Sequence, residues 1–212
     1  MAVSRSRCSL VTAIENRLRT LAPPATGLRL SCLGAARATR DGTPIRLRPR
    51  QIEILTLLAV DPGGFTPERL HYAIYGDRPV VSSTLEADVS HLRRATDAAI
   101  ANRVYRLTAP IRCDAADLLT ALDAGDTDAA LRLYRGPLLP DSETPGIVEW
   151  REHLDVAVRT AVLAGGDAGH ALALGERMPD DVEIHERALE LLPTGDGRRA
   201  VATARLHTAL RS

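Results

Sequence analysis

The spacing of apolar residues changes along the chain, and this change limits the folds that the chain can adopt. Between residues 28 and 47 apolar residues alternate with polar ones, as in Leu28-Arg-Leu-Ser-Cys32, which predicts half-buried strands. Asp41-Gly42 lies between two such runs and is a strong short-range signal for a hairpin. From Pro49 onward apolar residues recur every three or four positions, which is typical of amphipathic helices. The sequence therefore predicts an α+β fold that begins with a small platform of strands.

Three helices are expected after this platform. The first opens at Pro49, and the second opens at Thr66-Pro67, where a threonine N-cap precedes a proline in the first turn. The third is expected over 83–96, where Ser83 and Glu86 have the S-x-x-E spacing of a capping box. The buried stripe of this third helix is expected to consist of Leu85, Val89 and Leu92.

A short strand over residues 104–107 is expected after a turn at Asn102-Arg103. Hairpin platform, three helices and closing strand follow one another in the order of a winged helix. Upstream, residues 9–21 have helical spacing and residues 22–27 interrupt it, so residues 1–27 are interpreted as a helical extension and linker. Because one short helix is unstable alone, it is expected to pack on another surface, such as a second copy of the chain.

From Asp114 to the end every pattern is helical. Asp114 and Asp126 are expected to be the N-caps of two short helices. A longer helix ends near Gly165-Gly166, and three shorter helices follow. Antiparallel helix pairs with short loops predict an all-α, tetratricopeptide-like stack. We therefore expect a winged-helix domain over 28–112 and a helical domain over 113–212.

Charge is unevenly distributed although the formal net charge is zero. All 27 basic residues are arginines. Residues 1–113 hold 17 arginines against 9 acidic residues, a net of +8, and residues 114–212 hold 10 against 18, a net of −8. A biased composition explains the missing lysines but not the separation. Such asymmetry indicates that one half faces an anion and the other faces protein.

Several classes of protein are excluded. No apolar run approaches the ~18 residues that a membrane span needs. No signal peptide is visible in residues 1–25, so a cytoplasmic location is expected. Cys8, Cys32 and Cys113 are too few and too scattered for a disulfide framework or a CxxC metal site, so neither metal nor cofactor is expected.

An enzyme is not expected either. The six histidines never pair with cysteines or acids at a known ligand spacing. The glycine-rich run at 165–170 lacks the GK[ST] of a phosphate-binding loop and follows a helix, not a strand.

Particular residues bring the sequence close to a known family. The runs Arg46–Leu58, Phe65-Thr-Pro-Glu-Arg-Leu70 and Val89-Ser-His-Leu-Arg-Arg94 resemble the OmpR-type winged helix, and Tyr105-Arg-Leu107 resembles the end of its wing. Tyr134-Arg-Gly-Pro-Leu-Leu-Pro140 is similar to the hallmark of the bacterial transcriptional activator domain. Winged helix and activator domain together resemble the Streptomyces antibiotic regulatory protein family. The winged-helix pattern also resembles the carboxyl-terminal part of actinobacterial regulators with an upstream GAF sensor domain.

The resemblance implies a transcriptional regulator that binds double-stranded DNA. It implies a homodimer on repeated sites, with the helical domain used for dimerisation or for contact with RNA polymerase. A winged helix places its third helix, here 83–96, in the major groove, and the wing touches the adjacent backbone. The residues expected at the DNA are Thr84, Ala87, Ser90, His91, Arg93, Arg94, Arg103 and Arg106. Tyr105 is expected to pack against the helices instead, and Arg48 and Arg50 to lie on a solvated face.

Two features favour other interpretations. Asp88 lies on the recognition helix, where a carboxylate facing phosphate is repelled, and Asn102-Arg103-Val104 makes a short wing. The alternative function is therefore a protein-interaction module with a degenerate winged helix that no longer binds DNA. A third interpretation is a carboxyl-terminal fragment of a longer sensor-regulator.

Overall fold

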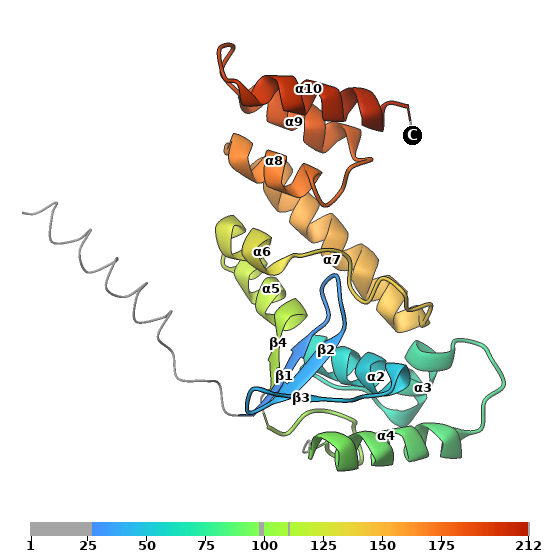
Figure 1. The fold of residues 1–212 in the computed structure, drawn as a ribbon. Helices are drawn as coiled ribbons and strands as arrows, with labels where there is room; N and C mark the ends of the chain where they lie inside the picture. Colours follow the sequence, from blue (N-terminus) through green and yellow to red (C-terminus); the bar gives the residue numbers. More distant parts are fainter. Residues whose placement is uncertain (1–26, 98–99, 110, 212) are drawn as a thin grey trace, which may run out of the picture.

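The computed structural model of the chain describes residues 27–97, 100–109 and 111–211. The helix expected at 9–21, its linker and Cys8 lie outside the described residues. The described part is elongated: a sheet with three helices lies at one end, and a column of helices extends from it (Figure 1). None of the described helices has the length and apolar character needed to span a bilayer.

The N-terminal platform is a four-stranded sheet of order β3-β2-β1-β4. Strands β1 (Leu28–Ser31), β2 (Arg37–Arg40) and β3 (Thr43–Ile45) are successively antiparallel, with Leu28 opposite Arg40. The expected hairpin at Asp41-Gly42 is confirmed, and both residues have positive φ (49° and 80°), as a type I′ turn requires. Strand β4 (Arg112–Cys113) adds to β1 in parallel. The sequence did not predict β4, because two residues are too few to show a period.

Three helices follow strands β1 to β3 in the predicted order. Helix α2 (Pro49–Val60) and helix α3 (Pro67–Tyr75) begin at their expected prolines, and Thr66 accepts a hydrogen bond from the Arg69 amide as N-cap. Helix α4 (Ser82–Thr96) buries the predicted stripe. The predicted capping box is wrong: α4 starts at Ser82, its N-cap position is Val81, and no side chain caps it. The spacing of apolar residues thus predicted the buried face of α4 correctly, whereas the capping motif did not predict its first residue.

The wing is less regular than predicted. The strand expected over 104–107 is wrong, because only isolated bridges join Phe65 to Tyr105 and Ile100 to Leu107. Tyr105 is 7% exposed, as expected for a residue packed under the wing. The backbone amide and carbonyl of Tyr105 pair with those of Phe65 at 2.8 and 2.9 Å. The wing is thus held by two bridges and not by a continuous ladder.

The remainder of the chain forms a stack of helices above the sheet (Figure 1). Neighbouring pairs in the stack are α5 with α6, α8 with α9, and α9 with α10. This arrangement agrees with the predicted all-α, tetratricopeptide-like stack. The helices are α5 (Asp114–Asp123), α6 (Thr127–Leu133), α7 (Pro145–Ala164), α8 (Ala168–Gly175), α9 (Val182–Leu191) and α10 (Arg198–Ala209).

The two predicted aspartate caps behave differently. Asp126 caps α6, since its carboxylate accepts from the Ala129 amide at 2.9 Å. Asp114 does not cap α5: it is the first helical residue, and its carboxylate accepts from the Cys32 amide at 2.8 Å. The prediction for Asp114 was wrong because a partner 82 residues away competes for its oxygen.

The sheet end and the helical stack are in close contact. The Gly34 amide donates to the Pro137 carbonyl, and the Leu139 amide donates to the Cys32 carbonyl, each at 2.9 Å. Helix α7 packs on α3, where a Cβ on Gly146 would lie 2.9 Å from the Ala73 Cβ. Glycine is therefore required at this position, because the helix backbones approach too closely for a side chain.

Candidate nucleic-acid interface

Helix α4 presents one side of its surface to solvent. Leu85, Val89 and Leu92 are 2%, 0% and 0% exposed and face the core. On the other side lie five of the residues expected at DNA, all of them exposed: Thr84, Ala87, Ser90, His91 and Arg94. Four of the five follow a spacing of three, four and three residues, so they form one stripe along the helix. The structure thus brings these predicted residues together.

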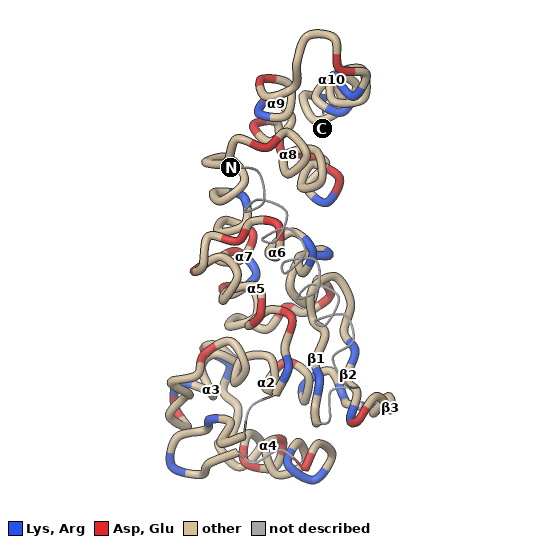
Figure 2. The backbone as a smooth tube through the Cα atoms, turned by 90° about the vertical axis from the view of Figure 1, so that its left-hand side faces the viewer, with Lys and Arg blue, Asp and Glu red and all other residues tan. Residues whose placement is uncertain are grey.

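This stripe lies at an end of the molecule. Helix α4 runs along the edge opposite to the outer helices of the stack, α9 and α10 (Figure 1). Basic segments gather on β1 and β2, α4 carries both basic and acidic segments, and acidic segments are frequent in α5 to α9 (Figure 2). Within the described residues, the sheet is thus richer in basic segments and the helical stack is richer in acidic ones.

Two arginines of the wing are also exposed. Arg103 and Arg106 are exposed on either side of the buried Tyr105. Gly64, which faces this turn, has a φ of +76°, and a Cβ there would lie 2.6 Å from the Arg106 Cβ. Glycine at residue 64 therefore allows the wing to approach the core closely. Within the described residues, no hydrogen bond or ion pair involves the guanidinium groups of Arg94, Arg103 and Arg106, so these groups are available to an anion.

Arg93 differs from its neighbour Arg94. It is half-buried, and its guanidinium donates to the carbonyls of Ile100 and Ala101 and to the Asn102 Oδ1, at 2.6 to 3.2 Å. Arg93 therefore ties helix α4 to the segment that leads into the wing. This role was not visible in the sequence, because two of its three acceptors are backbone carbonyls, which every residue carries.

Asp88 is bonded within the protein. The Tyr75 hydroxyl donates to its Oδ2 at 3.0 Å. Burial, followed by the hydrogen bond to Asp88, raises the pKa of Tyr75 to about 12, so this hydroxyl keeps its proton at neutral pH. The concern that Asp88 faces a phosphate is therefore weakened, since its carboxylate has a partner on α3.

Tyr75 also connects α4 with the helical stack. The Arg50 guanidinium lies 5.1 Å from the centre of the Tyr75 ring and donates to the Thr144 Oγ1 at 3.0 Å, just before α7. Arg50 forms an ion pair with Glu53 at 2.9 Å, and Glu53 accepts from the Ser142 hydroxyl at 2.7 Å. Arg50 is thus not on the solvated face that the sequence predicted. Arg48 is exposed, as expected.

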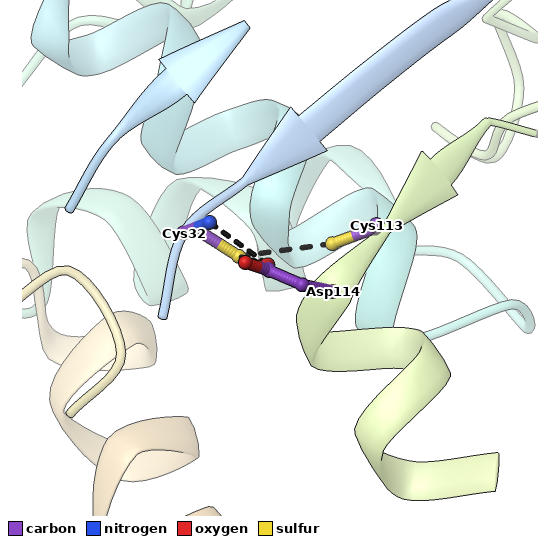
Figure 3. A group of neighbouring side chains, drawn as sticks. All are labelled: Cys32, Cys113 and Asp114. Carbon is purple, nitrogen blue, oxygen red and sulfur yellow. Dashed lines mark hydrogen bonds between the residues drawn. The ribbon is translucent and has the colours of Figure 1, made fainter. Parts of the chain in front are cut away.

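A second cluster was missed by the sequence analysis. Cys32, Cys113 and Asp114 meet where β1, β4 and α5 join (Figure 3). The two Sγ atoms lie 3.7 Å apart, and the Cys32 Sγ lies 3.1 Å from the Asp114 Oδ1. The parallel pairing of β4 with β1 creates this contact. Cys32 and Cys113 are 81 residues apart in the sequence, so no local pattern indicates that they meet.

The two thiols of this cluster differ in acidity. The hydrogen bond with Cys32 and the amides of Ala116 and Ala115 at the start of α5 lower the pKa of Cys113. The same hydrogen bond, burial and the nearby charges raise the pKa of Cys32. The amides at the start of α5 therefore favour a negative charge on the Cys113 sulfur.

Comparison with known proteins supports the fold. No family model matches the chain. It is 40% identical over 168 residues, 74% of its length, to an uncharacterized 47.3 kDa protein of the thcA 5′ region of Rhodococcus erythropolis, of which it covers 38%. EmbR of Mycobacterium tuberculosis, solved in complex with a low-affinity phosphopeptide, superposes with a TM-score of 0.59 at 21% identity, over 88% of this chain and 58% of the EmbR chain. The chain thus spans less than two thirds of both proteins. The likeness to EmbR shows the fold: a winged helix followed by a helical domain.

Proposed function

We propose that the chain is a DNA-binding transcriptional regulator of the Streptomyces antibiotic regulatory protein type, with α4 in the major groove. One observation carries this proposal: the exposed stripe of α4 combines hydrogen-bond donors with an unpaired arginine, Arg94, at an end of the molecule. An α-helix fits the major groove, where side chains at base edges distinguish all four base pairs. The shared fold with EmbR supports the same function.

Each exposed residue has a role that fits its chemistry. Arg94 can bind guanine O6 and N7 through two donors, or neutralise a phosphate. Thr84, Ser90 and His91 can donate to phosphates or base edges, and Ala87 can contact a thymine methyl group. The wing arginines, Arg103 and Arg106, would bind the adjacent backbone, where affinity comes from charge and not from sequence.

Arg93 is assigned an additional role in this proposal. Its guanidinium holds the carbonyls of residues 100 and 101, so it would fix the distance between the wing and α4. The interaction-module alternative rested on Asp88 and on the short wing. The hydrogen bond from Tyr75 weakens the argument from Asp88, because this carboxylate has a partner within the protein.

The remaining partners follow from charge and fold. We assign DNA binding to residues 28–112, and dimerisation or RNA polymerase contact to the acidic residues 113–212. The N-terminal extension, residues 1–27, is proposed as a further dimer contact. Any further activities of the Rhodococcus protein and of EmbR would reside in the parts of those proteins that this chain does not match.

Selection followed by base protection tests the proposal. The purified chain would select binding duplexes from a random pool, and dimethyl sulfate would then methylate guanine N7 in the major groove of the selected duplex. We expect enrichment of one sequence and protection of its guanines over a few adjacent base pairs. Enrichment of no sequence, or guanines that stay fully reactive in the complex, would contradict the proposal.

A further inference from the structure

We propose that Cys32, Cys113 and Asp114 form a binding site for a thiophilic divalent cation, with Zn²⁺ as the best-fitting ion. The three side chains offer two sulfurs and one carboxylate oxygen, all within 4.8 Å of one another. Thiolate and carboxylate ligands are found in protein zinc sites, whereas Mg²⁺ and Ca²⁺ prefer oxygen alone.

The distances match tetrahedral coordination. Zinc–sulfur bonds of ~2.3 Å at a tetrahedral angle place two sulfurs about 3.8 Å apart. The Cys32 and Cys113 Sγ atoms are separated by 3.7 Å. For one sulfur and one oxygen ligand the same geometry gives about 3.5 Å, against 3.1 Å between the Cys32 Sγ and the Asp114 Oδ1. Two of the three ligand pairs therefore lie within a few tenths of an ångström of tetrahedral separations, and the third pair, Cys113 with Asp114, lies within 4.8 Å.

The surrounding backbone holds the ligands in place. The Cys32 amide donates to the Asp114 carboxylate at 2.8 Å, and the Leu33 amide at 3.4 Å. Such hydrogen bonds orient a ligating carboxylate. Cys113 occupies the N-cap position of α5, and the positive end of the helix dipole favours the negative sulfur that a metal requires. The cysteines are 0% and 1% exposed, so their arrangement is fixed by the core.

A fourth coordination position can be supplied from solvent. Asp114 lines a cavity of about 170 Å³ that opens between β1, β4 and α6. This cavity gives a water molecule or a small anion access to the metal beside the carboxylate. Its lining also includes a second carboxylate, Asp117, and four arginines, Arg29, Arg112, Arg132 and Arg135. Their positive charge would offset the negative charge of two thiolates and a carboxylate around a dication.

A disulfide fits the same cysteines less well. The direct neighbour of Cys113 across the strands is Leu30, and Cys32 is two residues further along the chain. This stagger opposes the close approach of backbones that a disulfide needs. Both sulfurs are also shielded from an external oxidant.

Cobalt binding tests the site with a built-in control. The reduced, chelator-treated chain would be titrated with Co²⁺, whose bonds to thiolates produce a charge-transfer absorption. We expect one equivalent to bind, Zn²⁺ to displace it, and the absorption to be lost in Cys32→Ser and in Cys113→Ser. Cys8→Ser, which removes the cysteine outside the cluster, should keep the full signal. No absorption in the wild-type chain, or a signal that depends on Cys8, would overturn the proposal.

A second measurement does not depend on the folding of the variants. X-ray absorption of the Zn²⁺-loaded Cys8→Ser chain should show two sulfur ligands at about 2.3 Å and oxygen ligands near 2.0 Å. Fewer than two sulfurs would refute the site even if the buried cysteine variants fail to fold.

Discussion

The hydrogen bond between Tyr75 and Asp88 should contribute measurably to the stability of the winged helix. Tyr75 is 8% exposed, and its hydroxyl donates to the Asp88 Oδ2 at 3.0 Å. The substitution Tyr75→Phe removes the donor, keeps the ring and leaves a half-buried carboxylate without this partner. Hydrogen bonds to charged groups contribute about 1.5–3 kcal/mol, and partial exposure of Asp88 favours the lower end of that range.

We therefore expect Tyr75→Phe to lower the free energy of unfolding by about 1.5 kcal/mol. For a chain of 212 residues this corresponds to a fall in Tm of about 3–6 °C. Tyr72→Phe is the matched control, because Tyr72 lies on the same helix with 61% of its surface exposed. The control should change stability by less than about 0.5 kcal/mol.

A double-mutant cycle with Asp88→Ala isolates the interaction. Urea unfolding would be followed by far-ultraviolet circular dichroism for the wild-type chain, both single variants and the double variant. The expected coupling energy is about 1 kcal/mol or more, because each single variant loses the same bond. A coupling energy below about 0.3 kcal/mol would refute the assignment of Asp88 to Tyr75, and Asp88 would again be free to face the duplex.

Two further predictions concern the wing and the helical stack. Arg93→Ala should speed hydrogen exchange of the backbone amides at 100–107, since the variant loses the bonds to the Ile100 and Ala101 carbonyls; Arg94→Ala should not, and equal exchange in both variants would contradict the role given to Arg93. In the stack, the Tyr134 hydroxyl donates to the Asp155 Oδ1 at 2.7 Å, and burial raises the pKa of Asp155. A raised carboxyl pKa means that the folded state holds the proton to higher pH than the unfolded state, so its stability falls as pH rises from the ordinary aspartate range through the folded-state pKa. The free energy of unfolding of Asp155→Asn, relative to that of the wild-type chain, should therefore be higher at neutral pH than at about pH 3. Urea unfolding of both chains at the two pH values measures this difference. An equal difference at both pH values would contradict the reasoning.

Local signals predicted much of the fold. The alternation from Leu28 to Cys32, the Asp41-Gly42 turn and the buried stripe of α4 each depend on neighbours a few residues apart. The helices of the stack follow from the same periodicity, and the exposed side of α4 is the complement of its stripe. A pattern that repeats within one element is therefore sufficient to place these features.

Long-range partners account for several features that the sequence analysis missed. Asp114 was assigned to a cap, but it binds the Cys32 amide from a neighbouring strand. Asp88 accepts a hydrogen bond from Tyr75 on another helix, a partner that the sequence analysis did not identify. The Cys32–Cys113 contact needs the two-residue strand β4, which has no periodic signal. In each case the partner is set by tertiary packing, which a single sequence does not reveal.

The central claim, that the exposed side of α4 binds duplex DNA, is tested most directly by a matched pair of arginine variants. Arg94→Ala removes an exposed guanidinium from α4, and Arg132→Ala removes one from α6. Fluorescence anisotropy with the selected duplex would be recorded at several salt concentrations for both variants and the wild-type chain.

We expect wild-type affinity to fall as salt rises, because bound phosphates release counterions. Arg94→Ala should weaken binding by about tenfold or more if Arg94 reads a base, or reduce the salt slope by about one unit if it binds a phosphate. Arg132→Ala should retain wild-type binding. Equal binding by the Arg94→Ala and wild-type chains at every salt concentration, or an equal loss in both variants, would contradict the claim.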